Sequence, residues 1–415
     1  MPSNLSISAP RIQSRLFELG QIGRTGSGGV TRLALSQEDL RAQDLVSSWM
    51  RQAGMEVRRD HFGNLIGRKE GEEPKAPAIV IGSHIDSVPN GGRFDGTLGV
   101  IGGIEVVQVL HDANIRHKLP IEVVAFCDEE GARFESGLFG SRGMAGRVTD
   151  GDLNRVDGDG ISRYEALCSA GVDPRRMADS IRHRGDIEVY LEMHIEQGPF
   201  LESIHQPVGI VTGIAGVAWL MISLIGEAGH AGTVPMNLRR DPMMGAAEVI
   251  LAVERACKSG QVTTTVGTVG KIHAQPGSSN VIPGMVEFTV DIRDIEQRQR
   301  DDTILRVKSA LDRICRDRSL EYRIEEGLNI QSVQCSTEVV GVIEESARKL
   351  HLDPVKMVSG AGHDAMAMAD ICDVGMIFVR CRNGISHHPA EWASPEDMAT
   401  GTRLLLETVL SYIES

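Results

Sequence analysis

The sequence predicts an α/β protein in which a mixed, mostly parallel sheet flanked by helices is interrupted by a smaller α+β insertion with an antiparallel sheet. Between residues 76 and 131, short apolar runs that end in polar or glycine-rich turns alternate with a segment of helical length. From about residue 216 the pattern changes to strands joined by turns and hairpins. We therefore expect a larger domain, residues 1–215 and 330–415, and an inserted domain, residues 216–329.

The larger domain begins its sheet with a β-α-β unit. Residues 76–86 (APAIVIGSHID) and 119–131 (LPIEVVAFCDEEG) are predicted strands, and residues 97–115 between them have helical length and spacing. A third strand, residues 186–198, follows a polar helical connection around residues 161–180. All three strands end in acidic or histidine side chains. Because open α/β sheets place their sites at the carboxyl ends of the strands, we expect a site there.

The inserted domain and the C-terminal region each have their own pattern. In the insertion, Asp241 is expected to cap a helix that has Pro242 at its first position. Strands of the insertion are expected at residues 219–232, 263–283 and 284–294, and helices at residues 241–260 and 295–318. After residue 330 we expect a helix at residues 336–352, a strand at residues 374–381 and a terminal helix.

Composition and charge exclude several classes of protein. The net charge of −14, with lysines and arginines scattered along the chain, argues against a nucleic-acid or membrane-surface partner. No apolar segment approaches the roughly 20 residues of a membrane span, and the N-terminus lacks a signal-peptide pattern, so a cytoplasmic location is expected. The 7 cysteines include no C-x-x-C pair, which favours reduced thiols over disulfides or a cysteine-ligated zinc.

His84 and Asp86 lie together where the first strand ends. Positions two apart in an extended chain share a face, so Asp86 can hold the His84 ring while that ring faces a metal. An incidental ion pair is the simpler explanation of these two residues alone. Asp95 follows in GGRFDG, where glycines let the backbone turn sharply and bring the carboxylate near His84. A turn aspartate that binds local N–H groups is the commoner role.

Four further side chains extend this cluster. Glu129 and Glu130 are adjacent carboxylates that must diverge, face solvent or share a strong positive charge. His194 lies in the third strand and His387 in GISHHPAE, although a lone histidine is more often structural. Taken together, two histidines, a short aspartate, a glutamate and a third histidine would hold two divalent ions that share a bridging carboxylate. The second glutamate would then be free to act as a base.

Seven segments together resemble the amidohydrolases of the hydantoinase/carbamoylase family. They are GSHIDSVPNGGRFDG, DEEGARF, EMHIEQG, GHAGTVPM, NVIPG, SGAGHDA and GISHHPAEW, and they span nearly the whole chain in the family's order. The family contains N-carbamoyl-L-amino-acid hydrolases, β-ureidopropionases and allantoate amidohydrolases, within the clan of dinuclear metallopeptidases and aminoacylases. The resemblance implies that the larger domain is a dinuclear-metal catalytic domain and that the insertion serves dimerisation and substrate binding.

The resemblance also implies two divalent ions per subunit. The implied ligands are His84 and His194 for one ion, Glu130 and His387 for the other, and Asp95 as the bridge. His388 fills a variable place in the family's pattern G-[IV]-S-H-x-P. Peptidase branches usually have a carboxylate where this chain has His194, which disfavours a peptidase. Histidine and carboxylate ligands suit Zn²⁺, Mn²⁺ and Co²⁺ alike.

Catalytic roles implied by the resemblance fall on three residues. The ions would lower the pKa of a water molecule, and Glu129 would take its proton as the water attacks the ureido carbonyl. His230 would stabilise the oxyanion, and Asp86 would support the site from behind. Glu129 would then pass the proton to the leaving nitrogen. The products would be a free L-amino acid, ammonia and carbon dioxide.

Substrate contacts are implied in both domains, three in the insertion and three in the larger domain. A bidentate guanidinium suits an α-carboxylate, although Arg293 could equally pair with Asp291 or Asp294 if the resemblance is set aside. The implied substrate-binding residues are Gln197, His230, Asn280, Arg293, Gly362 through its backbone, and His363. Relatives dimerise through the insertion, and His230 and Asn280 enter the partner's site. We therefore expect a homodimer with shared active sites that binds a small molecule, and neither nucleic acid nor membrane.

One tripeptide distinguishes the alternative activities within the family. Allantoate-handling relatives tend to carry Gln-x-Arg where this chain has Val217-Ala218-Trp219, and carbamoylases resemble this apolar version. We therefore expect an N-carbamoyl-L-amino-acid hydrolase. Allantoate amidohydrolase or β-ureidopropionase is the alternative, and aminoacylase or dipeptidase activity is less expected. Trp219 could also simply pack in the core. A non-catalytic binding protein would be expected to lack Glu129 or a ligand, and a dinucleotide-binding protein would need G-x-G-x-x-G.

Overall fold

The computed structural model describes residues 5–259 and 264–413 and divides into two compact units. The larger unit comprises the chain up to Thr212 and from Cys335 onward, and the inserted unit is Gly213–Gln334. The predicted boundaries lie between residues 215 and 216 and between residues 329 and 330, within five residues of the observed ones. Gly260 and Thr263, where an expected helix ends and an expected strand begins, lie outside the described residues.

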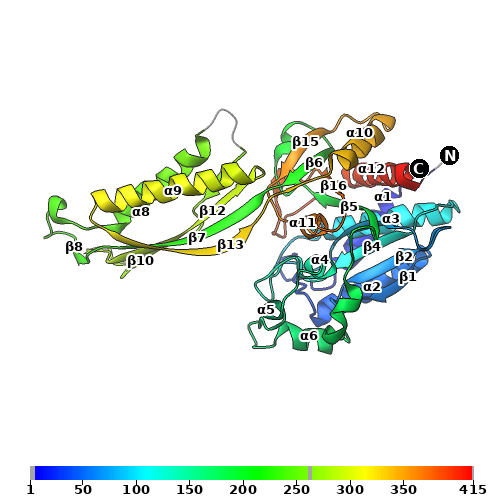
Figure 1. Ribbon diagram of the computed structural model, residues 1–415, viewed down its shortest axis with the longest axis horizontal. Coiled ribbons are helices and arrows are strands. Elements are labelled where there is room, and N and C mark those ends of the chain that lie inside the picture. Colours follow the sequence, from blue (N-terminus) through cyan, green and yellow to red (C-terminus); the bar gives the residue numbers. More distant parts are fainter. Residues whose placement is uncertain (1–4, 260–263, 414–415) are drawn as a thin grey trace. The chain divides into compact units, whose positions relative to one another are not determined.

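A nine-stranded mixed sheet forms the centre of the larger unit (Figure 1). Its path is β1-β2-β4-β3-β5-β16-β6-β14, and β15 pairs with β6. The strands are β1 (Glu56–Arg59), β2 (Leu65–Lys69), β3 (Ala78–His84), β4 (Ile121–Phe126), β5 (Ile187–Ile195), β6 (Val208–Ile214), β14 (Val333–Gln334), β15 (Val355–Ser359) and β16 (Val374–Val379). Strands β4, β3, β5 and β16 are parallel to one another, so their carboxyl ends meet at one edge of the sheet.

Helices pack around this sheet, and α3 is the most deeply buried of the long ones. The long helices are α1 (Ala9–Leu19), α2 (Gln37–Gln52), α3 (Thr97–Asp112), α10 (Thr337–Lys349) and α12 (Pro395–Ile413). The short ones are α4 (Phe139–Met144), α5 (Asp150–Leu153), α6 (Arg163–Ser169), α7 (Phe200–Ser203), α11 (Ala365–Met368), η1 (Pro174–Ser180) and η3 (Arg382–Gly384). Helix α3 contacts β3 and β5 and also α1 and α12, which explains its apolar residues on every side. A Cβ on Gly99 would lie 2.3 Å from the carbonyl oxygen of Met193, so only glycine lets α3 approach β5 this closely.

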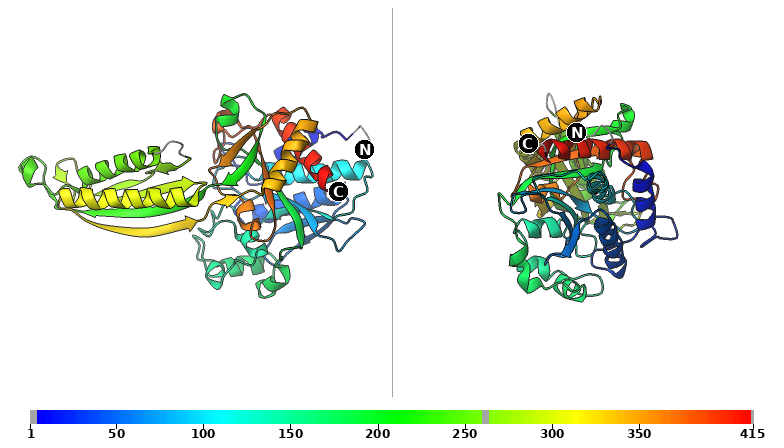
Figure 2. Two further views of the ribbon diagram at one scale, coloured as in Figure 1. Left: turned by 45° about the horizontal axis from the view of Figure 1, so that its top comes forward. Right: turned by 90° about the vertical axis from the view of Figure 1, so that its right-hand side faces the viewer.

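The inserted unit is a five-stranded antiparallel sheet, with α8 and α9 on one of its faces (Figure 2). Its order is β10-β12-β7-β13, with β9 on β12, and β8 and β11 form a separate pair. The strands are β7 (Gly216–Ile225), β8 (Gly229–His230), β9 (Val266–Thr268), β10 (Ile272–Gln275), β11 (Val281–Ile282), β12 (Met285–Asp294) and β13 (Glu321–Ile330). The helices are α8 (Pro242–Lys258), α9 (Gln297–Asp317) and η2 (Met236–Leu238). Alternate residues of β7, Leu220, Ile222 and Leu224, are buried in the core of this unit.

Several predicted elements are confirmed, and one strand was missed. The Asp241 side chain caps α8 by accepting a 2.9 Å hydrogen bond from the Met243 amide, with Pro242 at the first helical position. Strand β13, whose residues are nearly all exposed, was not predicted. Its segment EYRIEEGLNI does alternate, with apolar Tyr322, Ile324, Leu328 and Ile330 at every second position, but Glu326 interrupts the apolar series where the pairing with β7 shifts register.

The state of the cysteines and the character of the helices bear on two further predictions. The seven cysteines are free thiols, and each of them except Cys168 is buried. Within residues 5–259 and 264–413, no helix combines the length and the apolar character that crossing a bilayer requires.

Candidate metal centre

The parallel strands bring the five predicted metal ligands to one edge of the sheet. His84 is the last residue of β3, and His194 is the penultimate residue of β5. Glu130 follows β4, Asp95 lies in the turn before α3, and His387 lies in the loop after β16. Strand ends that are neighbours in space therefore gather residues that are up to 303 positions apart in the sequence (84 to 387).

Asp95 belongs to two groups of potential ligands. Its Oδ1 lies 3.1 Å from His194 Nε2 and 3.7 Å from His84 Nε2, and all three side chains are buried. Its Oδ2 lies 3.2 Å from His387 Nε2, which is 3.5 Å from Glu130 Oε2. In each group the ligand atoms lie within 4.8 Å of one another. The two groups thus share one carboxylate, with a different oxygen turned toward each.

The chemistry of these donors fits divalent cations. Burial lowers the pKa of His84 to about 4, so its ring is neutral. Its Nδ1 lies 3.1 Å from the backbone oxygen of Asp86, which places the proton on Nδ1 and leaves the Nε2 lone pair toward Asp95. Burial, followed by the charge of Asp95, raises the pKa of Glu130 to about 7. Against the effect of burial, the hydrogen bond to Asp95 raises the pKa of His194 to about 9, and the hydrogen bond to Asp95 also raises that of His387 to about 9. These crowded carboxylates therefore attract positive charge, which is what a metal supplies.

Asp86 acts differently from the expectation. We expected its carboxylate to hold the His84 ring, but the nearest carboxylate oxygen is 3.6 Å from Nδ1, farther than the backbone oxygen. The carboxylate instead accepts hydrogen bonds from the backbone amides of Glu129 (3.3 Å) and Glu130 (3.2 Å). Asp86 therefore fixes the backbone of the two adjacent acids, and its main chain orients the imidazole.

Glu129 lies beside the first group of ligands. Its Oε2 is 3.5 Å from His84 Nε2, and its side chain is 10% exposed. Burial, followed by the charges of Asp364 and Glu130, raises the pKa of Glu129 well above its usual value. The position suits a group that exchanges protons with a molecule bound at the ligands.

A buried arginine supports the turn that presents Glu129, and sequence reasoning missed it. Asp128 has a left-handed backbone (φ 56°), which is unusual for a residue other than glycine. The fully buried Arg163 donates a 2.7 Å hydrogen bond to Asp128 Oδ2 and lies over the rings of Phe134 and Phe139. Nothing in the spacing of Arg163, on the distant helix α6, connects it with the DEE segment.

His387 and His388 differ in their surroundings. His387 has a left-handed backbone (φ 54°) and turns its ring toward Asp95 and Glu130. His388 Nδ1 instead accepts a hydrogen bond from the Ala390 amide at 3.1 Å. Left-handed backbone at a residue with a side chain costs roughly 1 kcal/mol or more, and such positions cluster at functional sites.

The expected substrate residues of the larger unit take up varied positions. Gln197 (φ 57°) donates from Nε2 to Asp95 Oδ2 at 3.0 Å, and its buried Oε1 has no hydrogen-bond partner. Gly362 is exposed. His363 is buried, with its ring centroid 4.6 Å from that of His194 and its Nε2 2.7 Å from Ser359 Oγ. The His363 side chain therefore packs behind a ligand in this structure.

The expected residues of the inserted unit fall at its two ends. His230 and Asn280 are neighbours at β8 and β11, where the Ala231 amide donates to the Asn280 backbone oxygen. His230 Nδ1 accepts a 3.0 Å hydrogen bond from the Gly232 amide, so a neutral ring carries its proton on Nε2. Arg293 lies near the other end of β12. The eight steps from Met285 to Arg293 alone span about 26 Å.

Arg293 and Trp219 share a carboxylate on one face of the sheet. Asp291 accepts bonds from Arg293 Nε (3.0 Å) and Nη2 (2.8 Å), as the salt-bridge alternative anticipated. It also accepts a 2.8 Å bond from Trp219 Nε1. Trp219 is 47% exposed, whereas Val217 and Ala218 are buried. The tripeptide is thus not a continuous apolar surface, and Trp219 is not a core residue.

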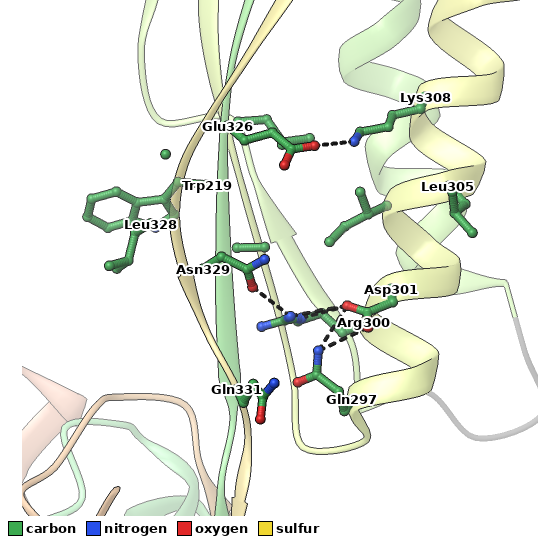
Figure 3. Close-up of a pocket in the computed structure, with 14 residues that line it drawn as sticks. Trp219, Gln297, Arg300, Asp301, Leu305, Lys308, Glu326, Leu328, Asn329 and Gln331 are labelled. Atoms are coloured by element: carbon green, nitrogen blue, oxygen red, sulfur yellow. Dashed lines mark hydrogen bonds and ion pairs between the residues drawn. The ribbon is translucent and has the colours of Figure 1, made fainter. Parts of the chain in front are cut away.

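A hollow of about 450 Å³ lies between α9 and β13 in the inserted unit (Figure 3). The buried Arg300 donates to Asp301, to Asn329 and to the backbone oxygen of Val217, so its guanidinium is already engaged. Figure 3 shows Trp219 and Leu328 on the side of the strands away from α9. Among the described residues that line this hollow there is no predicted metal-binding, catalytic or substrate-binding residue, although Ala218 and Trp219 of the tripeptide belong to them.

Known proteins are similar to this chain in sequence and in fold. Residues 80–411 match the model of peptidase family M20/M25/M40. An N-carbamoyl-L-amino-acid amidohydrolase from Pseudomonas sp. (strain NS671) is 54% identical over 411 residues, 99% of each chain. Another, from Geobacillus stearothermophilus, is 47% identical over 403 residues, 97% of this chain and 98% of that one. The crystal structure of a hydantoinase/carbamoylase family amidase from Burkholderia multivorans has a TM-score of 0.94 and 37% identity over 99% of both chains, which confirms the predicted fold class.

Proposed function

We propose a specific activity for this chain, which belongs to peptidase family M20/M25/M40. It is a metal-dependent amidohydrolase that cleaves the ureido C–N bond of N-carbamoyl-L-amino acids. The products would be a free L-amino acid, ammonia and carbon dioxide. The observation that carries the proposal is the Asp95 carboxylate, which is shared by two groups of metal ligands beside Glu129. We place the enzyme in the cytoplasm.

Two divalent ions per subunit would occupy these groups. His84 and His194 would hold one ion, Glu130 and His387 the other, and Asp95 would bridge them. Bound there, the ions would polarise the ureido carbonyl and lower the pKa of a water molecule. Zn²⁺, Mn²⁺ and Co²⁺ all suit this donor set.

Glu129 would be the general base and then the general acid. It would accept the proton of the attacking water and release it to the leaving nitrogen, so that protons balance over the cycle. Cations nearby would favour the ionised carboxylate that the first step needs. Asp86 would keep the Glu129 backbone in place through its hydrogen bond to the amide.

Residues outside the metal centre would bind the substrate. His230, with its proton on Nε2, would donate to the developing oxyanion. The buried, unpartnered Oε1 of Gln197 would accept a substrate N–H, and the Gly362 backbone would line the site. Arg293 and Asn280 would bind the α-carboxylate, which would take up Arg293 N–H groups now facing Asp291.

We further propose a homodimer with shared active sites. Support comes from the length of β12 in one inserted unit: Met285 and Arg293, near its opposite ends, are about 26 Å apart, and Asn280 precedes the strand on the Met285 side. One small carboxylate cannot touch both residues of the same copy. Two copies can supply one residue each, with His230 accompanying Asn280.

A substrate comparison tests the function. We expect kcat/KM for N-carbamoyl-L-methionine to exceed that for allantoate by at least about tenfold, or about 1.4 kcal/mol, because the second ureido arm of allantoate would lack partners. N-carbamoyl-D-methionine should be a poor substrate. Ammonia release from these compounds and N-carbamoyl-β-alanine would be measured, with the metal-stripped protein as control. Comparable or faster hydrolysis of allantoate would instead identify an allantoate amidohydrolase, and a preference for the β-alanine derivative a β-ureidopropionase.

A further inference from the structure

Glu391 holds the turn that carries Asp95, although the two residues are 296 positions apart (95 to 391). Its side chain is buried, and its Oε1 accepts hydrogen bonds from the amides of Phe94 (2.8 Å) and Asp95 (3.1 Å). Its Oε2 is 3.0 Å from Ser386 Oγ. Both carboxylate oxygens are therefore engaged by the protein itself, which distinguishes Glu391 from the acids that face the imidazoles.

Ser386 connects this carboxylate with the Asp95 side chain. Its Oγ lies 2.9 Å from Asp95 Oδ2, the oxygen that also faces His387. A hydroxyl has one proton, so Ser386 can donate to Asp95 or to Glu391 at any moment. The backbone amide and the side-chain oxygen of Asp95 are thus both fixed by a network that depends on Glu391.

The turn is built closely around this carboxylate. A Cβ on Gly92 would lie 1.9 Å from Glu391 Oε1, so any side chain at this position would displace the carboxylate. Next to the contact, the rings of Phe94 and Trp392 meet edge to face with centroids 5.7 Å apart. The position of the Glu391 carboxylate therefore depends on the turn that carries Asp95.

We propose that Glu391 is a positioning residue that sets the Asp95 carboxylate between the two metal sites before any ion binds. Without it, the amides of Phe94 and Asp95 lose their acceptor and Asp95 must be ordered by the metal, which weakens metal binding. The proposal rests on the metal-binding part of the proposed function and is independent of the substrate. A glutamine at this position would keep the acceptor for both amides and could donate to Ser386, whose proton would then face Asp95.

Metal binding without substrate tests this role. Full-length protein, stripped of metal, would be titrated with Zn²⁺ in competition with a chromophoric chelator. We expect Glu391→Ala to lower the affinity for Zn²⁺ at least tenfold and Glu391→Gln to lower it less than threefold. Excess Zn²⁺ should restore the turnover of Glu391→Ala, because the ion then orders Asp95.

Glu105→Gln is the matched control. This buried α3 carboxylate also accepts a backbone amide, from Ser8, and pairs with Arg11. The control should lower the melting temperature while leaving Zn²⁺ affinity unchanged. If Glu391→Ala does not fold, Gly92→Ala and Ser386→Ala, which disturb the same network from its other members, should show the loss of affinity. Folded Glu391→Ala or Gly92→Ala with Zn²⁺ affinity within twofold of the parent overturns the proposal, whatever the substrate assays show.

Discussion

Among individual residues, Glu129 differs from the other acids of the candidate metal centre in how it is held. Asp86 and Glu391 accept backbone amides, and Asp95 accepts from Gln197 and faces imidazoles. The Glu129 carboxylate lies 3.5 Å from His84 Nε2, which carries no proton when Nδ1 does. A carboxylate so weakly engaged is free to exchange protons, which is the property a general base requires.

Replacement of Glu129 by glutamine tests that property. The amide has nearly the same shape but cannot accept the proton, so we expect kcat to fall by far more than tenfold while both ions stay bound. Turnover and metal content, by elemental analysis, would be measured on the same preparation. A fall of less than tenfold would remove Glu129 as the base, and loss of an ion would reassign it as a ligand.

Site residues at the ends of strands could be located from the sequence. His84, Asp95, Glu130 and His194 follow or end predicted strands, and the structure gathers them as that placement implies. Glu391 and Arg163 could not be found in this way. Their partners are backbone amides or an acid in distant segments, and such contacts leave no spacing in the sequence. The contact of the Asp86 backbone oxygen with the His84 ring, which is shorter than that of its carboxylate, could not be predicted for the same reason.

Among the elements, α3 shows how backbone packing supports the site. It begins directly after the Asp95 turn and lies against β5, which carries His194. The length and spacing of residues 97–115 predict a helix, and α3 confirms it. The edge strand β13 was missed although its apolar residues alternate, because Glu326 interrupts the series where the register with β7 shifts.

The glycine contact of α3 gives a prediction for stability. Gly99→Ala places a methyl group 2.3 Å from the Met193 carbonyl oxygen, so α3 must shift, and we expect a loss of about 1–3 kcal/mol. Gly341→Ala in α10 is the control, because a Cβ there meets nothing within 4 Å. It should stabilise the protein by about 0.5–1 kcal/mol through helix propensity. Chemical unfolding of both variants would measure the difference, and equal stabilities would contradict the packing argument.

For the whole molecule, the proposed shared site predicts complementation between inactive chains. A heterodimer of His230→Ala and Glu129→Gln would contain one site with both residues intact, so about half of the parent activity is expected. The two chains would be co-expressed with different tags, and the heterodimer purified by both. A heterodimer of His84→Ala and Glu129→Gln is the control, because each site then has one defect in its own larger unit. Activity no higher than this control would show that His230 serves its own subunit.

The pairing of β6 with β14 also bears on the order in which the chain folds. Ile214 pairs with Val333 and Gly213 with Gln334, so the inserted unit returns the chain to nearly the point where it left. Without that pairing, the 122 residues from 213 to 334 form an open loop between His194 and His387. The entropy lost on closing a loop of this length opposes the approach of the two histidines by a free energy of about 4 kcal/mol. Once the insertion has folded, its ends are already neighbours, and this entropy no longer opposes assembly of the metal ligands. We therefore expect Zn²⁺ uptake during refolding to follow formation of the inserted unit. Hydrogen-exchange pulse labelling would contradict this order if amides of β7 and β12 became protected after the metal had bound.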